Sequence, residues 1–269
     1  MASDMGGLVY PPRSRNITPL GIPQKNDNIT TKDLGGFPSN TQDPYYSYTS
    51  LLLHGDGSNG SSIITDSSKY SRTLTSFGTI KNSISSYLFG GSSIALDGST
   101  SYATTPHAPE LSMDSSDMTI ECFFSLSAAP VNNAFIASKS GKSAVSSANY
   151  SIYINTSRQV GFFVSQTGAP GTTVVSLVTN TSLQTGIFYH IAWVKYQTNY
   201  YVFIGGRLSA SGSSSTTPLD TRAASLFIGW EDSQPNGIPN GYLEDFRVTK
   251  GVARYTADFI PPIRAFPDF

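Results

Sequence analysis

The strands of this chain that carry acidic residues lack the carboxylate pair on which hydrolysis of a glycosidic bond depends. Glycoside hydrolases place two carboxylates across the scissile bond, about 5–5.5 Å apart for retention of configuration and about 6.5–9.5 Å apart for inversion. Neither Glu121 nor Glu244 has a second acid beside it on its own strand face. Asp245 follows Glu244 directly, and because side chains alternate along a strand, the two are predicted to point to opposite faces. We therefore expect a structural pair and no enzymatic activity.

Other residue types that could do chemistry also lack the spacing of a reactive site. His54, His107 and His190 are far apart in the sequence, in neither a triad nor a metal-ligand pattern. The glycine-rich GDGSNG at 55–60 lacks the lysine and the following helix of a phosphate-binding loop, so it is predicted to be a turn. The single cysteine, Cys122, excludes an internal disulfide and is in phase with apolar neighbours in a predicted strand. We expect it to be a core residue.

Aspartates near turns are the residues that could hold a hard cation such as calcium, which takes several converging oxygen ligands. Asp56, Asp66 and Asp245 are the set predicted to meet, because the first and last strands of a β-sandwich are often close to each other. The competing interpretation is that aspartate is simply common in turns. A structural calcium ion is therefore a hypothesis, and no other cofactor is expected.

Five residues are candidates for binding a carbohydrate, because an aromatic ring stacks on a sugar face while amides and carboxylates bond its hydroxyls. They are Trp230, Asp232, Asn236 and Asn240, which lie in or beside one predicted loop, together with Tyr200. Loops often carry binding residues, although most loops only connect elements. The alternative interpretation of Trp230 is that it is a core residue.

The elements that must position these residues are short alternating strands separated by Gly, Asn, Ser and Pro turns. Strands are predicted at 50–54, 93–97, 101–104, 118–128, 133–139, 150–155, 159–166, 173–178, 188–196, 200–205, 224–231 and 242–249. Asp97-Gly98 marks a tight turn, and Asn199 is predicted as a hairpin hinge because asparagine tolerates positive φ. No long amphipathic helix is expected. The pattern predicts an all-β sandwich or barrel with mostly antiparallel pairing.

The segment from 241 to 262 alternates most regularly and then changes character. Uninterrupted alternation would put Tyr242, Glu244, Phe246 and Val248 on one face of a strand. Gly251 breaks this strand, and aromatic residues with a proline pair follow it. We expect this closing segment to fold back over the end of a sheet.

Composition excludes several classes of protein. The chain has 269 residues, a formal net charge of −1 and only 13% charged residues, so no field favours phosphate backbones and nucleic-acid binding is not expected. No run approaches the roughly 20 apolar residues of a membrane-spanning helix, so no membrane insertion is expected. The first residues lack the features of a signal peptide, which predicts assembly in the cytoplasm.

Residues 1–47 differ from the remainder, because six prolines interrupt them and their apolar residues follow no strand or helix period. One interpretation is a free tail; the other is an extended arm that docks on another subunit. The residues predicted to anchor such an arm are Tyr10, Arg13, Arg15, Leu20, Ile22 and Phe37. An arm of this kind and exposed sheet edges both favour a homo-oligomer.

From residue 48 onward the order of motifs resembles a known family. The motifs are LLLHGDG at 51–57 with TDSS at 65–68, LDGSTSY at 96–102, MTIECFF at 118–124, HIAWV at 190–194 and LEDFRVTKGVARY at 243–255. In order and spacing they resemble laminin-G-like, concanavalin A-like jelly-roll domains, especially those of bacteriophage virion and tail proteins. The resemblance covers residues 48–269 and leaves out the arm.

The resemblance implies a sandwich of two antiparallel sheets that binds carbohydrate or joins other proteins, sometimes with structural calcium. It implies a phage virion protein, a capsid decoration or a tail or fibre component, with a lectin-like domain displayed outward and other virion proteins as partners through the arm. Host-surface glycans are a further expected partner, and the virion is the expected location. A stand-alone carbohydrate-binding module is the alternative, and a glycan hydrolase is the third. Because one fold hosts many functions, the site must decide among them.

Overall fold

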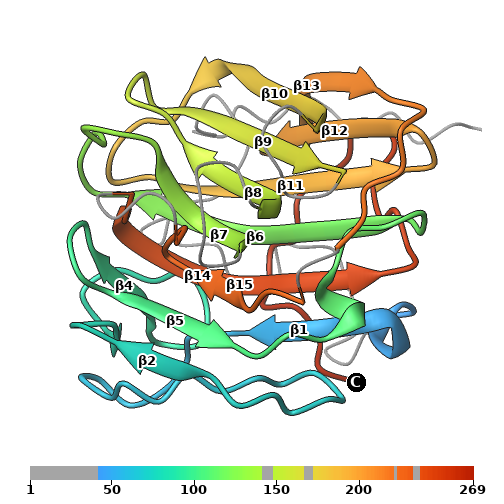
Figure 1. Ribbon diagram of the computed structural model, residues 1–269. Helices are drawn as coiled ribbons and strands as arrows, with labels where there is room; N and C mark the ends of the chain where they lie inside the picture. The colour runs from blue at the N-terminus through green and yellow to red at the C-terminus, as the bar shows by residue number, and fades with distance from the viewer. Residues whose placement is uncertain (1–41, 141–147, 167–171, 221–222, 233–236) are drawn as a thin grey trace, which may run out of the picture.

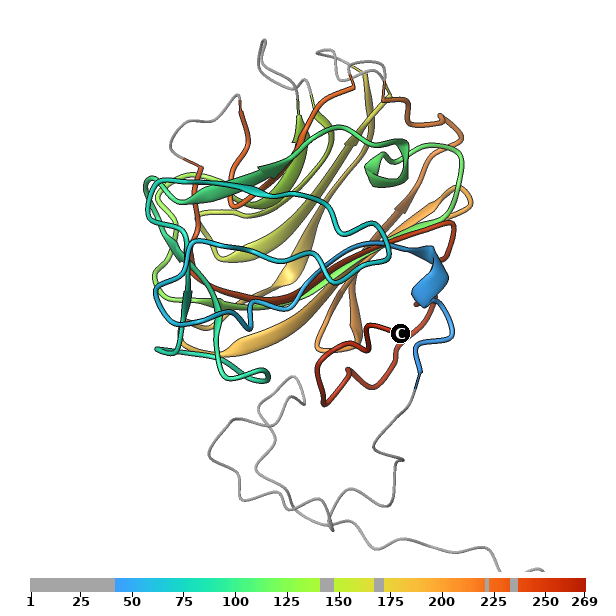
Figure 2. The same ribbon diagram turned by 90° about the horizontal axis from the view of Figure 1, so that it is seen from below.

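The computed structural model of the protein describes residues 42–140, 148–166, 172–220, 223–232 and 237–269. Within these ranges the chain forms two antiparallel sheets, one of eight strands and one of seven, which stack as two layers (Figures 1 and 2). This confirms the predicted all-β, two-sheet jelly-roll sandwich. Most of the predicted arm lies outside the described residues, so its docking and the domain boundary at residue 48 stay predictions.

Sheet A has the order β13-β12-β11-β6-β15-β4-β3, and β1 also pairs with β15. Its strands are β1 (Thr49–Leu53), β3 (Lys81–Ser83), β4 (Ser93–Asp97), β6 (Met118–Leu126), β11 (Phe188–Tyr196), β12 (Asn199–Ile204), β13 (Arg207–Ser213) and β15 (Asn240–Lys250). Sheet B has the order β10-β9-β8-β7-β14-β5-β2. Its strands are β2 (Thr75–Phe77), β5 (Tyr102–Thr105), β7 (Ala134–Ser140), β8 (Ala148–Ile154), β9 (Gln159–Ser165), β10 (Thr173–Ser182) and β14 (Leu226–Ile228).

Short 3-10 turns, η2 (Tyr46–Tyr48) and η3 (Pro109–Leu111), are the helical elements of the described residues. No helix in this part of the chain is long and apolar enough to cross a membrane.

The predicted hinge at Asn199 is wrong in detail: Asn199 begins β12, and Gln197, two residues earlier, has the positive φ of 54°. Asp97 makes the expected tight turn, because its Oδ1 accepts the backbone N–H groups of Ser99 (2.8 Å) and Thr100 (2.8 Å).

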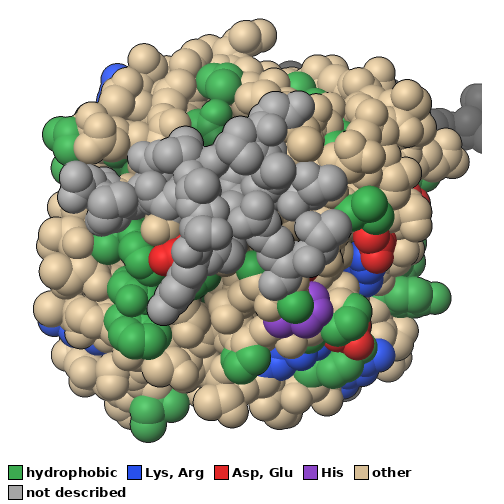
Figure 3. All heavy atoms as spheres, in the orientation of Figure 1, with side chains coloured by type: hydrophobic (Ala, Val, Ile, Leu, Met, Phe, Trp, Pro, Cys, Tyr) green, Lys and Arg blue, Asp and Glu red, His purple; other side chains and the backbone are tan. Residues whose placement is uncertain are grey.

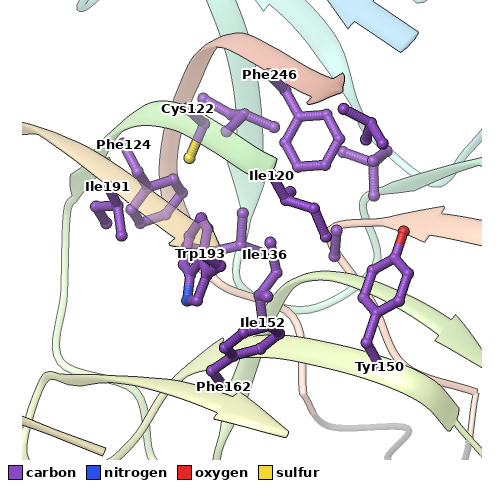
Figure 4. Close-up of a cluster of buried hydrophobic side chains, with 14 of the residues drawn as sticks. Ile120, Cys122, Phe124, Ile136, Tyr150, Ile152, Phe162, Ile191, Trp193 and Phe246 are labelled. Atoms are coloured by element: carbon purple, nitrogen blue, oxygen red, sulfur yellow. The ribbon is translucent and has the colours of Figure 1, made fainter. Parts of the chain in front are cut away.

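The main core lies between the two sheets and is filled by the inward side chains of central strands (Figure 4). Ile120, Cys122 and Phe124 of β6 alternate into it and are fully buried, which confirms the predicted packing role of Cys122. Trp193 of β11 spans to the opposite sheet, where its indole N–H donates to the carbonyl of Gly161 (3.2 Å). Because a buried indole nitrogen needs an acceptor, this bond satisfies Trp193 and links the two sheets at this point.

The sequence predicts uninterrupted alternation along the closing strand β15. The structure shows that this prediction is wrong. The register of β15 against β6 shifts between Glu244 and Arg247, and Asp245 within this β-bulge has a φ of 51°. Leu243 before the bulge and Phe246 after it both face the core. An extra residue in a bulge shifts the alternation by one, so Glu244 and Asp245 line one pocket instead of opposite faces.

The residues after β15 fold back on sheet A as expected, but they cover its outer face instead of its end. Tyr255 and Phe259 stack on each other and pack against Phe203 of β12. Phe266 packs on Phe123 of β6. Figure 2 shows that this segment ends beside the start of the described chain. The two ends of the described chain therefore meet over the outer face of sheet A.

Candidate functional site

An aromatic row lies on the outer face of sheet B, where β2, β5 and the residues after β14 come together. Phe77 pairs with Tyr102 across β2 and β5, and their rings stack with centroids 4.7 Å apart and planes 9° apart. The ring of Trp230 lies 4.6 Å from that of Tyr102. Phe77 is 40% exposed, and the other two rings are partly exposed. Figure 3 shows hydrophobic side chains gathered over β5 and β14 on this face.

Local backbone geometry explains why the three rings meet. In β5, Ala103 points into the core, so its neighbour Tyr102 points outward. Gly229, after β14, has a φ of 86°, which a side chain would strain, and a Cβ there would press against Leu96. The chain turns at this glycine and carries Trp230 beside Tyr102. The carbonyl of Trp230 is then held by the hydroxyl of Ser138 on β7 (3.0 Å).

Asp232 adds a polar group next to the aromatic row. Its backbone N–H donates to the hydroxyl of Ser140 (3.4 Å), which is itself 3.0 Å from the hydroxyl of Ser138. The Oδ2 atom of Asp232 is buried, and no hydrogen-bond partner for it lies among the described residues. A buried carboxylate oxygen without a donor is unfavourable by roughly 1–3 kcal/mol or more, so this atom would gain a hydrogen bond if a ligand displaced the groups that cover it.

The other predicted sugar-binding residues do not join this row. Tyr200 must be corrected to a core residue: it is 1% exposed and its ring packs on Phe162 between the sheets. Asn240 is exposed at the start of β15, opposite Asp97. Asn236 lies outside the described residues. Sequence reasoning missed Phe77 and Tyr102, which join the site through the pairing of β2 with β5.

The predicted calcium ligands do not converge. Both carboxylate oxygens of Asp66 accept hydrogen bonds from its own segment and from β1. The donors are the backbone N–H groups of Leu52 (2.9 Å), Ser68 (2.9 Å) and Arg72 (2.8 Å). Asp56 and Asp245 line a different pocket. Across the described ranges, no group of three or more His, Cys, Asp or Glu residues could hold a metal ion. The residues present therefore do not fit a calcium site.

The pocket that Asp56 and Asp245 line has a volume of about 210 Å³ and includes His54 and Glu244. His54 Nδ1 lies 2.6 Å from Asp245 Oδ1, while Asp245 Oδ2 accepts the backbone N–H of Phe266 (2.7 Å). Burial acts to lower the pKa of His54, but the hydrogen bond to Asp245 raises it overall. Asp245 thus joins β1, β15 and the C-terminal segment.

Glu244 holds the loop before β4 in a similar way. Its carboxylate accepts the backbone N–H groups of Leu88 (2.6 Å) and Phe89 (2.5 Å). Burial raises the pKa of Glu244 to about 7, although these two bonds act against the rise. Because both oxygens serve the backbone, the geometry supports a structural role for the acid pair.

A buried ionic network lies under the C-terminal segment, around Glu121 of β6. Arg247 donates to Glu121 Oε1 through Nη2 (2.8 Å) and to Asp43 Oδ2 through Nη1 (3.0 Å). Arg254 donates to both oxygens of Asp43, at 3.0 and 2.7 Å. His190 lies 3.0 Å from the other oxygen of Glu121. Burial acts to raise the pKa of Glu121, but Arg247 and His190 hold it below its ordinary value.

Comparison with known families agrees with this architecture. The family model described as the concanavalin A-like lectin/glucanases superfamily matches residues 97–254, which is more than half of the chain. The chain belongs to this superfamily. A comparison with curated protein sequences found no match.

Solved structures of the same fold include binding domains and one domain of an arabinanase. The binding domain of Paraclostridial Mosquitocidal Protein 1 has a TM-score of 0.59 at 12% identity, over 83% of this chain and 51% of that chain. The botulinum neurotoxin serotype G binding domain has a TM-score of 0.57 at 14% identity, over 76% and 48%. The chain therefore spans about half the length of these two structures.

Domain 4 of AbnA is similar over most of its own length. AbnA is a GH43 extracellular arabinanase from Geobacillus stearothermophilus, and this domain was solved in complex with arabinotriose. Its TM-score is 0.51 at 17% identity, over 76% of this chain and 93% of that chain. At such low identity these similarities describe the fold alone.

Proposed function

We propose that this domain binds carbohydrate on the outer face of sheet B, with Tyr102 and Trp230 as the stacking rings and Asp232 as a hydroxyl acceptor. The observation that supports this proposal is the partly exposed row of Phe77, Tyr102 and Trp230, together with the unpartnered Oδ2 of nearby Asp232. Rings supply an apolar platform for a sugar face, and a carboxylate supplies orientation. The complex of arabinotriose with a domain of the same fold supports a sugar ligand.

Glycan-array screening followed by titration of the best glycan tests this proposal. Trp230→Ala should weaken binding about tenfold, roughly 1.4 kcal/mol, because a stacked ring of this kind contributes on the order of 1 kcal/mol beyond its buried area. Tyr48→Ala is the matched control, because Tyr48 is 50% exposed on η2, away from sheet B. If both variants bound the glycan with the same affinity, the proposed site would be wrong.

Asp232→Asn refines the test without removing a ring. Asparagine keeps one carbonyl acceptor but loses the charge, so affinity should fall less than in Asp232→Ala. A decrease of similar size in both variants would assign the contribution to charge instead of to hydroxyl bonding. Circular dichroism and the melting temperature of each variant separate loss of binding from loss of fold.

We further propose that the protein is a structural or adhesion component of a bacteriophage particle, located in the virion and attached through its N-terminal segment. The order of motifs in the domain and the proline-interrupted composition of residues 1–41 support this proposal. The attachment is tested by deleting residues 1–41, which leaves Asp43 in its ionic network. The expected result is a folded domain that no longer co-assembles with particle proteins. Retained co-assembly would place the attachment elsewhere.

Two alternatives make different predictions. A stand-alone carbohydrate-binding module would bind glycans equally well with and without residues 1–41 and would associate with no particle. A glycan hydrolase would release reducing sugar from a polysaccharide. The carboxylates of Glu244 and Asp245 are engaged by backbone N–H groups and His54, so we expect no release.

A further inference from the structure

A groove of about 650 Å³ separates the start of the described chain from its C-terminal segment. Residues 42–44 form one side, and residues 260–267 and Phe269 form the other, with Arg247 and Arg254 also lining it. Figure 2 shows these two segments side by side below the sandwich. A groove of this volume accommodates several side chains of a peptide.

The walls of the groove are fixed by interactions with sheet A. The backbone N–H of Phe266 donates to Asp245 (2.7 Å), and its ring lies 3.7 Å from the guanidinium carbon of Arg247. The backbone N–H of Phe259 donates to the carbonyl of Gly206 (2.9 Å). A wall held in this way presents a preformed surface, which lowers the entropy lost on binding.

The charges in the groove do not call for an anionic ligand. The guanidinium nitrogens of Arg247 donate to Glu121 and Asp43. Those of Arg254 donate to Asp43 and to the hydroxyl of Thr249. Because these two cations are already neutralised by buried carboxylates, a phosphate or carboxylate would gain little from them. Arg264, the third arginine of the lining, is exposed on the C-terminal wall, where its charge is solvated. The occupant should therefore be apolar.

Apolar side chains of the C-terminal segment face solvent around this groove. Ile260 is 90% exposed, Ile263 is 37% exposed and Phe269 is 47% exposed. Prolines at positions 44, 261, 262 and 267 complete the lining. Contiguous exposed apolar surface marks interaction sites and ligand-binding grooves.

The chain itself offers a segment of matching character within reach. Gln42 lies on the groove wall, and the sequence LGGFP at 34–38 comes shortly before it. Four residues lie between Phe37 and Gln42, so the five Cα–Cα steps that join them span up to about 16–18 Å when extended. A covalently attached segment of this length has an effective concentration on the order of millimolar, which a separate molecule must exceed.

We propose that residues 34–38 of the same chain bind in this groove, with Leu34 and Phe37 against the apolar walls. The two glycines between these residues allow the chain to approach the walls closely. This contact would fix the point and direction from which residues 1–33 leave the domain. It concerns a different surface from the proposed sugar site and can fail independently of it.

Disulfide cross-linking in the full-length chain tests the contact. The only native cysteine, Cys122, is buried, so an introduced pair reacts without competition. Gly36→Cys combined with Ile260→Cys should form a disulfide within one chain under mild oxidation. Gly21→Cys with Ile260→Cys is the matched control, and its yield should be on the order of tenfold lower. Equal yields, or a disulfide-linked dimer as the main product, would overturn the proposal.

A second substitution distinguishes binding from mere proximity of a tethered segment. Phe37→Asp, added to the Gly36→Cys and Ile260→Cys pair, should reduce the yield several-fold, because a charged side chain does not bind an apolar wall. Ile17→Asp in the same background should leave the yield unchanged. An unchanged yield with Phe37→Asp would show that the cross-link reports only the tether, and the proposal would then be wrong.

Discussion

The backbone N–H of Asp43 donates to the carbonyl oxygen of Phe269 (3.1 Å), so the start of the described chain is hydrogen-bonded to its last residue. The carboxylate of Asp43 also forms ion pairs with Arg247 and Arg254. This arrangement ties the segment that leads to residues 1–41 to the outer face of sheet A. A mechanical force applied to that segment would therefore be transmitted to the central strand β15.

The first prediction concerns this tie. Asp43→Ala should lower the free energy of unfolding by about 3–5 kcal/mol, because it removes the carboxylate that Arg254 binds through two nitrogens and leaves buried Arg247 with Glu121 alone. Urea denaturation measures the change. Asp258→Ala is the control, because its partner Arg207 has a side chain that is 74% exposed and that surface pair should contribute nothing measurable. A loss for Asp43→Ala as small as that of the control would contradict the prediction.

The second prediction concerns pH. Burial raises the pKa of Glu244 from 4.5 to about 7, so between these values the folded state binds more protons than the unfolded state. The contribution of Glu244 to stability is therefore fully present below pH 4.5 and is lost as the pH rises through about 7. Denaturant unfolding at a series of pH values should show stability falling over this range, and Glu244→Gln should flatten the fall.

Two neighbours of Glu244 contribute with the same sign. Burial raises the pKa of Asp245, and the bond to Asp245 outweighs burial to raise the pKa of His54. Glu244→Gln should therefore remove only part of the slope. Glu110→Gln serves as control, since the Glu110 side chain is 38% exposed. Identical slopes in the wild type and in Glu244→Gln would assign the pH dependence to other groups.

The third prediction concerns the outer face of sheet B. The ring of Tyr153 lies directly over Gly161, its partner across β8 and β9, and a Cβ at Gly161 would collide with that ring. Gly161→Ala should cost about 1–3 kcal/mol through overpacking. Adding Tyr153→Ala should recover most of this loss, and a double-mutant cycle measures the coupling. Additive effects of the two substitutions would show that the ring moves aside freely.

The fourth prediction concerns the single thiol. Cys122 is fully buried in β6, and burial raises its pKa well above the ordinary value. A colorimetric thiol reagent should therefore not react with the native protein and should titrate one thiol after addition of denaturant. Rapid labelling without denaturant would mean that β6 opens easily, contrary to its place in the centre of sheet A.

Much of the fold could be predicted from local pattern. Residues 93–97 and 188–196 form strands with the predicted bounds, because alternating and β-branched runs between turn residues favour strands wherever they pair. The sequence analysis did not predict the three-residue strands β2 and β3 or the seven-residue strand β13. The residues of β2 are largely exposed, and what makes them a strand is hydrogen bonding to β5, which no local pattern reports.

The site depended on tertiary structure more than the fold did. The sequence by itself placed Trp230 near the end of a predicted strand at 224–231 and Asp232 just after it, and it showed that the acids of β15 lack a catalytic pattern. Phe77 and Tyr102 form one row with Trp230 only in the folded chain. The side chains of Glu244 and Asp245 line the same pocket only because of the bulge at Asp245. Alternation is a property of one strand, whereas register and bulges are set by its partner strand, so these features appear only when the sheets assemble.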